Sequence, residues 1–305
     1  MSEHWFDADP ENGYQDAEFE TAEGFLSALN PAAEPWSPNP RRWLFRGHAD
    51  SAWKLIPSAH REDLKPWDLF PQFRLHASRG DHSRAELELW VEVGHSIDFA
   101  GLEIPGDSQA LRHAHTQAQL FRDDWPPIDL LPALAILQHY GAPTRLLDWC
   151  RSARIAAYFA ARDRAQAELS LELSHARTAA PSVSVWALDL EFIRAKWPAS
   201  DRPPALTVVT VPYVSNPNVH AQTGAFTVYR GQPSSLDVII NEKLGDSRAK
   251  PHPLKKLSLP ASETRRLMRL LAWEGTSAAT VFPGYRGAIE RVAEERLWDP
   301  KPWTR

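Results

Sequence analysis

The chain has 305 residues, of which 43% are hydrophobic and 24% are charged, a balance that is typical of a soluble globular protein with a sizeable core. Its formal net charge of −5 excludes a general affinity for nucleic acid or for an anionic membrane, although a local basic cleft is compatible with it. The single cysteine, Cys150, excludes a disulfide within the chain and a zinc site built from several cysteines.

The N-terminal segment is acidic and has no apolar signal region, and no stretch of the chain reaches the roughly 18 apolar residues of a membrane span. We therefore expect a cytoplasmic protein that does not associate with a membrane. Residues 1–20 are predicted to form a flexible acidic leader. The oligomeric state cannot be inferred from this pattern.

The first ordered elements are expected after residue 20. Thr21 is placed to cap a short helix that ends near residue 29, and Trp43-Leu-Phe-Arg-Gly-His has the pattern of a strand that runs into a polar turn. A second strand-like piece follows over residues 53–61. Residues 61–130 are predicted to be a helical insertion, with helical texture over residues 85–93 and 108–121.

The middle of the chain alternates between apolar and polar character. Residues 130–140 form an apolar helix pattern, which Gly141 and Pro143 would terminate. Residues 144–149 are predicted to be an extended turn, with Asp148 capping a helix that begins near Arg151. That helix is rich in alanine over residues 153–161, so we expect it to pack closely on a sheet.

The remaining residues alternate between strand and helix patterns. Strands are predicted over residues 183–190, 206–211, 219–229, 236–240 and 251–259, and helices over 263–273, where Ser262 would be the cap, and 289–297. We expect an α+β fold for residues 21–305, with a mixed or antiparallel sheet flanked by helices in a single domain.

An unusual set of polar residues lies between the two apolar helices of the middle segment, within Gln138 to Asp148. Such a set is either an active site or a structural network that satisfies helix ends. Arg46 has the same two interpretations. It is either a buried arginine paired with a carboxylate such as Asp148, or an anchor for a phosphate or carboxylate, which a planar guanidinium binds bidentately. His139 and Asp148 are the candidates for general acid–base work.

Five segments stand out along the chain: Trp43-Leu-Phe-Arg-Gly-His, Leu137-Gln-His-Tyr-Gly-Ala-Pro-Thr-Arg-Leu-Leu-Asp-Trp, Ala156-Ala-Tyr-Phe-Ala, Ala221-Gln-Thr-Gly-Ala-Phe-Thr and Thr280-Val-Phe-Pro-Gly-Tyr-Arg-Gly. Together they resemble the FRG domain family, which is named for a Phe-Arg-Gly motif, here Phe45-Arg46-Gly47. The resemblance covers about residues 40–295, with the motifs in the expected order. It implies a bacterial protein, and it loosely implies a role in phage defence or toxicity. One departure is Cys150, since family members usually carry Thr at this place.

The layout is also similar to that of a divergent ADP-ribosyltransferase. That superfamily places an Arg on an early strand, a Ser, Thr or His on a strand that precedes a helix, and a Glu or Gln on a later strand. The matching residues here are Arg46, Thr144 and Gln222, and the resemblance implies NAD as the ligand. Because Gln222 is neutral, the carboxylate that stabilises an oxocarbenium-like cation would be Asp148 or Glu290.

These considerations define the expected site. The ligand is expected to be a nucleotide or another anion, with a protein or a nucleic acid as the target, and no metal is expected. The candidate catalytic residues are Arg46, His139, Thr144, Asp148 and Gln222, and the candidate ligand-binding residues are Gly47, His48, Gln138, Tyr140 and Arg145.

Three other functions remain open at this point. A hydrolase would use Cys150 with His139 and Asp148, although a cysteine before an apolar helix is more often buried and inert. A metal-dependent nuclease would use Asp148 with the pair Asp189 and Glu191. A ligand-sensing or protein-binding module would use the same cleft without catalysis.

Overall fold

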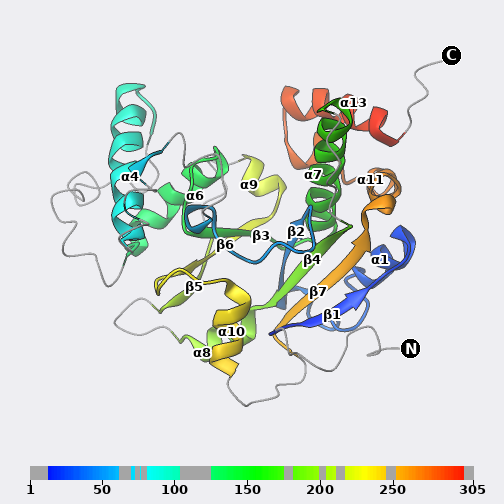
Figure 1. The fold of residues 1–305 in the computed structure, drawn as a ribbon, viewed down its shortest axis with the longest axis horizontal. Helices are drawn as coiled ribbons and strands as arrows, with labels where there is room; N and C mark the ends of the chain where they lie inside the picture. Colours follow the sequence, from blue (N-terminus) through cyan, green and yellow to red (C-terminus); the bar gives the residue numbers. More distant parts are fainter. Residues whose placement is uncertain are drawn as a thin grey trace.

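A seven-stranded mixed sheet runs through the molecule (Figure 1). The computed structural model describes residues 13–61, 70–72, 76, 81–103, 125–174, 181–198, 204–210, 217–244 and 252–298. The edge strand β1 is parallel to β7, and the other neighbours are antiparallel, which confirms the expected α+β class. In spatial order the strands are β1 (Gln15–Glu18), β7 (Leu254–Pro260), β4 (Ser182–Asp189), β2 (Trp43–His48), β3 (Leu146–Cys150), β6 (Gly224–Tyr229) and β5 (Leu206–Val209).

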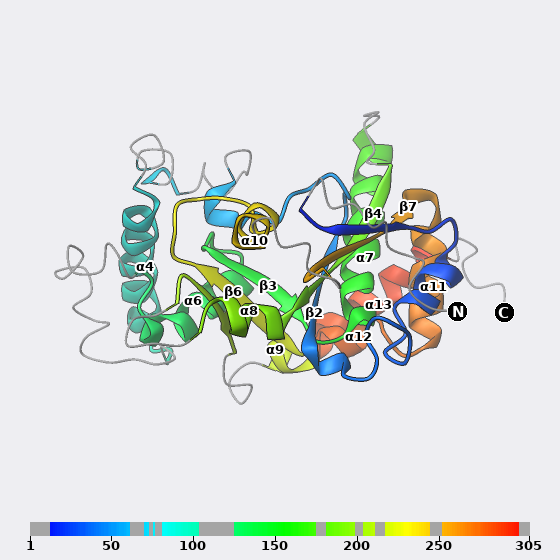
Figure 2. The same cartoon turned by 90° about the horizontal axis from the view of Figure 1, so that it is seen from below.

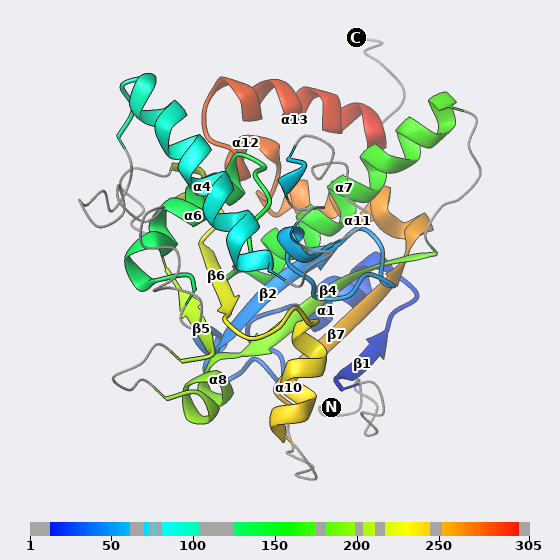
Figure 3. The same ribbon diagram turned by 60° about the vertical axis from the view of Figure 1, so that its left-hand side comes forward.

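One face of the sheet is covered by helices from both ends of the chain. The long helix α7 (Ala153–Ser174) crosses β2 and β4, and α11 (Thr264–Trp273) packs on α7 and on α1 (Ala22–Ala28). Helix α7 packs closely on the sheet, as the alanine-rich sequence predicts. Its small residues Ala156, Ala157 and Ala161 are fully buried in the core that it shares with the sheet. Helices α12 (Ala278–Val281) and α13 (Tyr285–Trp298) extend this layer beside α7 (Figure 3).

The opposite face and one end of the sheet have their own cores. Helices α8 (Leu190–Lys196) and α10 (Leu236–Leu244) cover the other face, where Leu44, Trp186 and Leu188 are buried. The alternation along β2 explains this, because Trp43 and Phe45 belong to the core under α7. Helices α4 (His82–Phe99), α6 (Leu131–His139) and α9 (Pro217–Ala221) lie at the β5–β6 end of the sheet (Figure 2). The described residues also contain the 3₁₀ turns Pro40–Arg42, Ser58–His60, Ile128–Leu130 and Ala261–Glu263.

The sheet is weakly joined at its centre, between β2 and β3. These strands share a single register pair, Phe45 opposite Cys150, whereas β2 and β4 are paired along the whole of β2. If the ladder continued, Gly47 would lie opposite Asp148. The two strands instead part beyond Phe45, and polar side chains of both lie where the ladder ends.

Several local predictions are confirmed. Thr21 caps α1 by accepting a hydrogen bond from the amide of Gly24. The strand at 43–48 and the helices near 85–93, 130–140 and 263–273 are present, although the last begins with a 3₁₀ turn and is not capped by Ser262. Gly141 has φ 89° just beyond α6, as a helix stop requires. The expected helix at 108–121 lies outside the described residues.

Other local predictions are wrong for identifiable reasons. Residues 15–18, which we placed in the leader, form β1 because they pair with β7. Residues 236–240 are helical, since the buried positions 236, 239, 240 and 244 follow helical rather than alternating spacing. The segment 53–61 contains a 3₁₀ turn instead of a strand, and 217–221 is the helix α9.

Asp148 does not cap α7, as the turn prediction required. Residues 146–150 form β3, so Asp148 lies in the middle of a strand, and Ser152 precedes the helix instead. The Ser152 hydroxyl accepts a weak hydrogen bond from the amide of Ile155 at 3.4 Å. The carboxylate of Asp148 is therefore available for other contacts.

Candidate functional site

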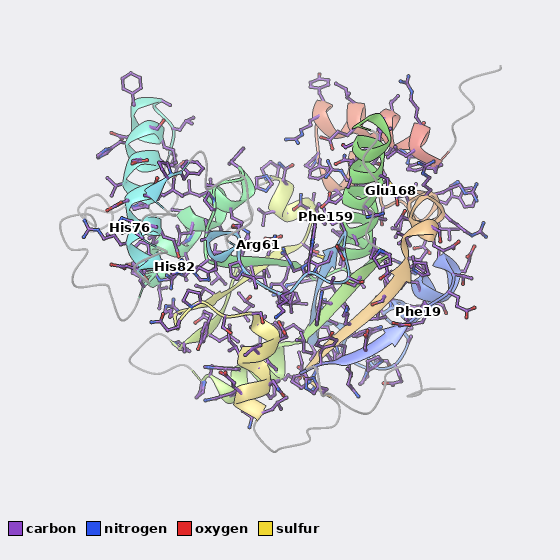
Figure 4. All side chains as sticks on the ribbon, viewed as in Figure 1. Phe19, Arg61, His76, His82, Phe159 and Glu168 are labelled. Atoms are coloured by element: carbon purple, nitrogen blue, oxygen red, sulfur yellow. The ribbon has the colours of Figure 1, made fainter. Side chains whose placement is uncertain are left out.

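A pocket of about 510 Å³ opens where β2 and β3 part. Its size lies within the range of ligand sites in proteins, roughly 300–1,000 Å³. Arg61 and Phe159, which line it from a loop and from α7, lie in the middle of the molecule between α6 and α7 (Figure 4). The polar and charged lining residues are Arg46, His48, Arg61, Gln138, His139, Tyr140, Asp148, Arg162, Asp163, Asn218, Gln222 and Arg286, and the larger aromatic ones are Trp53, Phe159 and Phe282.

Arg46 and Asp148 form an ion pair in this pocket. Nη1 of Arg46 lies 2.7 Å from Oδ2 of Asp148 and donates to the backbone oxygen of the same residue at 2.7 Å. The Arg46 side chain is only 13% exposed, whereas 53% of the Asp148 side chain is exposed. The expected pairing of Arg46 with Asp148 is present, and Arg46 also lines the pocket, where its role as an anion anchor stays a prediction. The printed contacts of the guanidinium use Nε and Nη1, and Nη2 makes no hydrogen bond to another described residue.

The Asp148 carboxylate is held ionised by its neighbours. The walls of the pocket limit its hydration and would raise its pKa, but the Arg46 guanidinium and the Gln138 amide together bring the pKa of Asp148 below its ordinary value. Nε2 of Gln138 donates to Oδ1 of Asp148 at 2.6 Å. Each carboxylate oxygen therefore has a fixed donor, which keeps the group charged and oriented at neutral pH.

His48 lines the pocket and also positions Arg46. Its side chain is buried, Nε2 accepts a hydrogen bond from Nε of Arg46 at 3.0 Å, and Nδ1 lies 3.2 Å from the backbone oxygen of Trp53. These partners assign the proton to Nδ1 of a neutral ring, because the carbonyl can only accept and Nε of Arg46 can only donate. Burial and the adjacent Arg46 lower the pKa of His48 well below its ordinary value, in agreement with a neutral ring.

Thr144 also acts indirectly, so its predicted place in the pocket wall is wrong. Its side chain is buried, and its hydroxyl donates a short hydrogen bond to Oε1 of Gln138 while accepting one from the amide of Leu146. Gln138 is thereby fixed so that its amide nitrogen faces Asp148. The three residues form one chain of hydrogen bonds in which only Gln138 and Asp148 reach the pocket.

Arg145 lies outside the pocket, which corrects its prediction as a ligand-binding residue. It is 3% exposed, and its Nε lies 2.9 Å from the carboxylate of Glu86 on α4. It also donates to the backbone oxygen of Trp125 and to the hydroxyl of Ser83. Arg145 and Asp148 are three residues apart in an extended segment, where successive side chains point in opposite directions, so only Asp148 faces the pocket.

The other predicted residues do line the pocket. Nε2 of His139 lies 2.9 Å from Nδ2 of Asn218, and burial and the charge of Arg286 lower the pKa of His139. Tyr140 is 81% exposed. Gln222 donates to the backbone oxygen of Val281 at 3.4 Å and thus joins the β6 side of the pocket to α12.

The sequence prediction missed the charged residues that α7 contributes. Arg162 and Asp163 line the pocket from this helix, and Phe159 does so one turn earlier. The signal was present as a helical spacing, because Ala156, Phe159 and Asp163 lie at i, i+3 and i+7 on one face. With Arg61 and Arg286, which lines the pocket from α13, the described lining carries four arginines against two aspartates. This balance favours an anionic ligand.

The family comparison covers the lining residues from Phe45 to Asp163. Residues 41–169 match the family model of the FRG domain. Over this range the chain is similar to an FRG domain. No curated protein and no solved structure gives a significant match. The pocket residues Gln222, Phe282 and Arg286 lie beyond the matched range, so the FRG domain does not form the pocket alone.

The structure explains the three residues for which the FRG domain is named. Phe45 is buried in the core under α7, and Arg46 reaches the pocket. Gly47 allows the close crossing of α7, because a Cβ at this position would lie 2.0 Å from the backbone oxygen of Ala156 and 2.8 Å from the amide nitrogen of Ala160. No side chain can be accommodated there without moving the helix.

The residues required by two of the alternative functions are occupied elsewhere. Burial raises the pKa of Cys150 to about 12, so its buried thiol is not a nucleophile at neutral pH. Asp189 caps α8 and pairs with Arg42, and Arg42 also pairs with Glu191. These contacts lie at the end of β2 that is away from the pocket. In the described ranges no three His, Cys, Asp or Glu side chains are grouped to hold a metal ion. Nor does any helix of these ranges combine the length and apolarity needed to cross a membrane.

Proposed function

We propose that the pocket binds NAD or a closely related anionic nucleotide and that the chain transfers its ADP-ribosyl group. The observation that carries this proposal is the Arg46–Asp148 pair, a guanidinium beside an ionised and fixed carboxylate on the pocket wall. A phosphate and a cation-like sugar are the two features of NAD that these groups complement.

The arginines suit the pyrophosphate of such a ligand. Arg46, Arg61 and Arg286 reach the pocket from β2, from the loop after it and from α13. A planar guanidinium binds phosphate oxygens in a bidentate fashion, and each charge-assisted hydrogen bond stabilises a complex by about 1.5–3 kcal/mol. Aromatic side chains at the same wall, Phe159 and Phe282, form an edge-to-face pair with ring centroids 6.0 Å apart and offer an apolar surface to a base.

Asp148 suits the bond-breaking step. The bond between C1′ of the ribose and the nicotinamide nitrogen breaks, the bonding electrons leave with nicotinamide, and a nucleophile of the acceptor forms a bond to C1′. Positive charge develops on the ribose as the first bond breaks, and a fixed carboxylate stabilises it. Since Glu290 is paired with Arg162 and Arg286 and does not line the pocket, Asp148 is the better candidate for this role.

The acceptor is a protein or a nucleic acid, and we place the activity in bacterial phage defence or toxicity. The proposed role in phage defence or toxicity is based on the similarity to FRG domains, and the proposed class of acceptor is based on the ADP-ribosyl transfer chemistry. The cytoplasm is the compartment in which NAD and such acceptors meet.

The first test is incubation of the purified chain with labelled NAD and a cell lysate. We expect NAD consumption and label transfer by the wild type, and a decrease of about 10–100-fold in kcat/KM for Arg46→Ala, because one charge-assisted contact to phosphate is lost. The matched control is Arg266→Ala, which removes an exposed arginine that pairs with Glu23 outside the pocket and should leave the rate unchanged.

If NAD is not consumed, two further measurements distinguish the remaining functions. A folded wild type that binds NAD or another nucleotide without consuming it would be a ligand-sensing module. Magnesium-dependent cleavage of nucleic acid without NAD chemistry would identify a nuclease that does not use the Asp189 and Glu191 pair.

A further inference from the structure

A second carboxylate lines the pocket, and the reaction described above gives it no role. Asp163 projects from α7 at the same wall as Phe159, and 52% of its side chain is exposed. Asp148 enters the pocket from β3, so two different elements each supply one carboxylate. The charges of Asp148 and Arg46 both act on Asp163, which places the three groups within electrostatic reach of one another.

The two carboxylates have different surroundings. Both oxygens of Asp148 have a close donor, from Arg46 and Gln138. The Asp163 carboxylate contacts only Arg162 among the described residues, at 3.5 Å, and that guanidinium has a closer partner in Glu290 at 2.9 Å. Asp163 is therefore free to exchange a proton with a ligand, whereas Asp148 is fixed in its ionised form.

We propose that Asp163 is the general base that takes the proton of the acceptor as the acceptor attacks C1′. The inference rests on the proposed function and adds a catalytic residue to it. The acceptor oxygen or nitrogen forms its bond to C1′, its proton moves to an oxygen of Asp163, and the electron pair of the broken glycosidic bond leaves with nicotinamide. Asp148 stabilises the sugar cation during this exchange and keeps no proton.

The electrostatic setting supports this division. The pocket walls limit the hydration of Asp163 and raise its pKa, the positive charges of Arg162 and Arg46 oppose this rise, and the negative charge of Asp148 adds to it. A raised pKa makes the carboxylate a stronger base, which favours proton transfer. The other charged side chains of the pocket, Arg61 and Arg286, are cationic, and Glu290, which pairs with Arg162, does not line the pocket.

The pH dependence follows from the required protonation state. A general base acts when it is deprotonated, so the transfer rate of the wild type should fall as pH decreases through the raised pKa of Asp163. His139 also lines the pocket, but burial lowers its pKa, so its titration would appear at lower pH than that of an ordinary histidine. If Asp163 causes the decrease of the transfer rate at low pH, this decrease should be absent from the pH profile of Asp163→Asn.

The test compares Asp163→Asn with Asp148→Asn and with Glu168→Gln, a carboxylate variant on the same helix outside the pocket (Figure 4). We expect Asp163→Asn to lower transfer by about 10²-fold with NAD affinity unchanged, and Glu168→Gln to be near the wild type. Azide, an anionic acceptor that needs no base, should restore cleavage of NAD in Asp163→Asn and not in Asp148→Asn. An unchanged rate and pH profile in Asp163→Asn, or no azide rescue, would overturn this assignment alone. Absence of NAD turnover in the wild type would overturn the proposed function and the assignment with it.

Discussion

Arg145→Met is expected to lower the free energy of unfolding by about 3–5 kcal/mol, the usual cost of leaving one partner of a buried ion pair alone. Glu86 is 2% exposed, and the substitution removes the guanidinium that faces both of its carboxylate oxygens at 2.9 Å. The indole of Trp125 still donates to Oε2 of Glu86 at 3.2 Å, but it carries no charge that could replace the guanidinium. Denaturant-induced unfolding, followed by circular dichroism, measures the change.

The matched control lies on α4, the helix that carries Glu86. Arg84→Met removes an exposed arginine that pairs with Glu88 on the surface of α4, and it should cost less than about 1 kcal/mol. The double variant Glu86→Leu/Arg145→Met leaves no buried charge, so it should be more stable than Arg145→Met alone. Equal, small effects for Arg145→Met and Arg84→Met would show that the pair is not buried in solution.

The Glu86–Arg145 pair also predicts that the folded state loses stability in acid. Burial alone would raise the pKa of Glu86, but Arg145 and His60 lower it to about 2, below the roughly 4.3 of an unfolded chain. A group with a lowered pKa in the folded state stabilises that state above the unfolded pKa. This contribution should be lost as pH falls from about 4.5 to about 2, and Arg145→Met should show much less of the loss.

Asp148→Asn is expected to lower NAD consumption by about 10³-fold, because it removes the charge that stabilises the ribose cation in the transition state. Asn keeps the shape of the side chain, and Arg46 retains its hydrogen bond to the backbone oxygen of residue 148. The ligand should therefore still bind, and kcat should fall while KM changes little. Steady-state kinetics of nicotinamide release, with unfolding curves for both proteins, provide the measurement.

An unchanged kcat in Asp148→Asn would assign the transition-state charge to another group, with Asp163 as the remaining carboxylate of the described pocket lining. A variant that loses NAD binding as well as turnover would indicate that Asp148 shapes the pocket through Arg46. The two outcomes are separated by measuring binding and rate on the same preparation.

The sequence was sufficient to predict the Arg46 side of the pocket and the segment from Gln138 to Asp148. It could not separate Asp148 from Arg145, although both lie in the same six-residue stretch. That distinction depends on where β3 begins, since alternation sends Leu146, Asp148 and Cys150 to one face. We predicted a turn there, and a turn imposes no such alternation.

Asp163 illustrates a different limit. A charged residue in an alanine-rich helix is usually solvent-exposed. The helical spacing places Asp163 on the same face as Ala156 and Phe159, but it does not indicate that this face reaches a pocket. The contact depends on the crossing of α7 over β2 at Gly47 and on the partnership of Arg162 with Glu290, which lies more than 120 residues later in the chain. The fold class followed from strand and helix patterns, whereas β1 could be recognised only through its pairing with β7.

The most direct test of the central claim is a calorimetric titration of NAD into the purified wild type and into Arg46→Ala. We predict binding to one site per chain, weakened by added salt because the contacts are ionic and weakened at least about tenfold in Arg46→Ala. Absence of binding to the folded wild type at NAD concentrations up to about 1 mM, the upper end of the usual range of KM, would contradict the claim that this pocket is an NAD site.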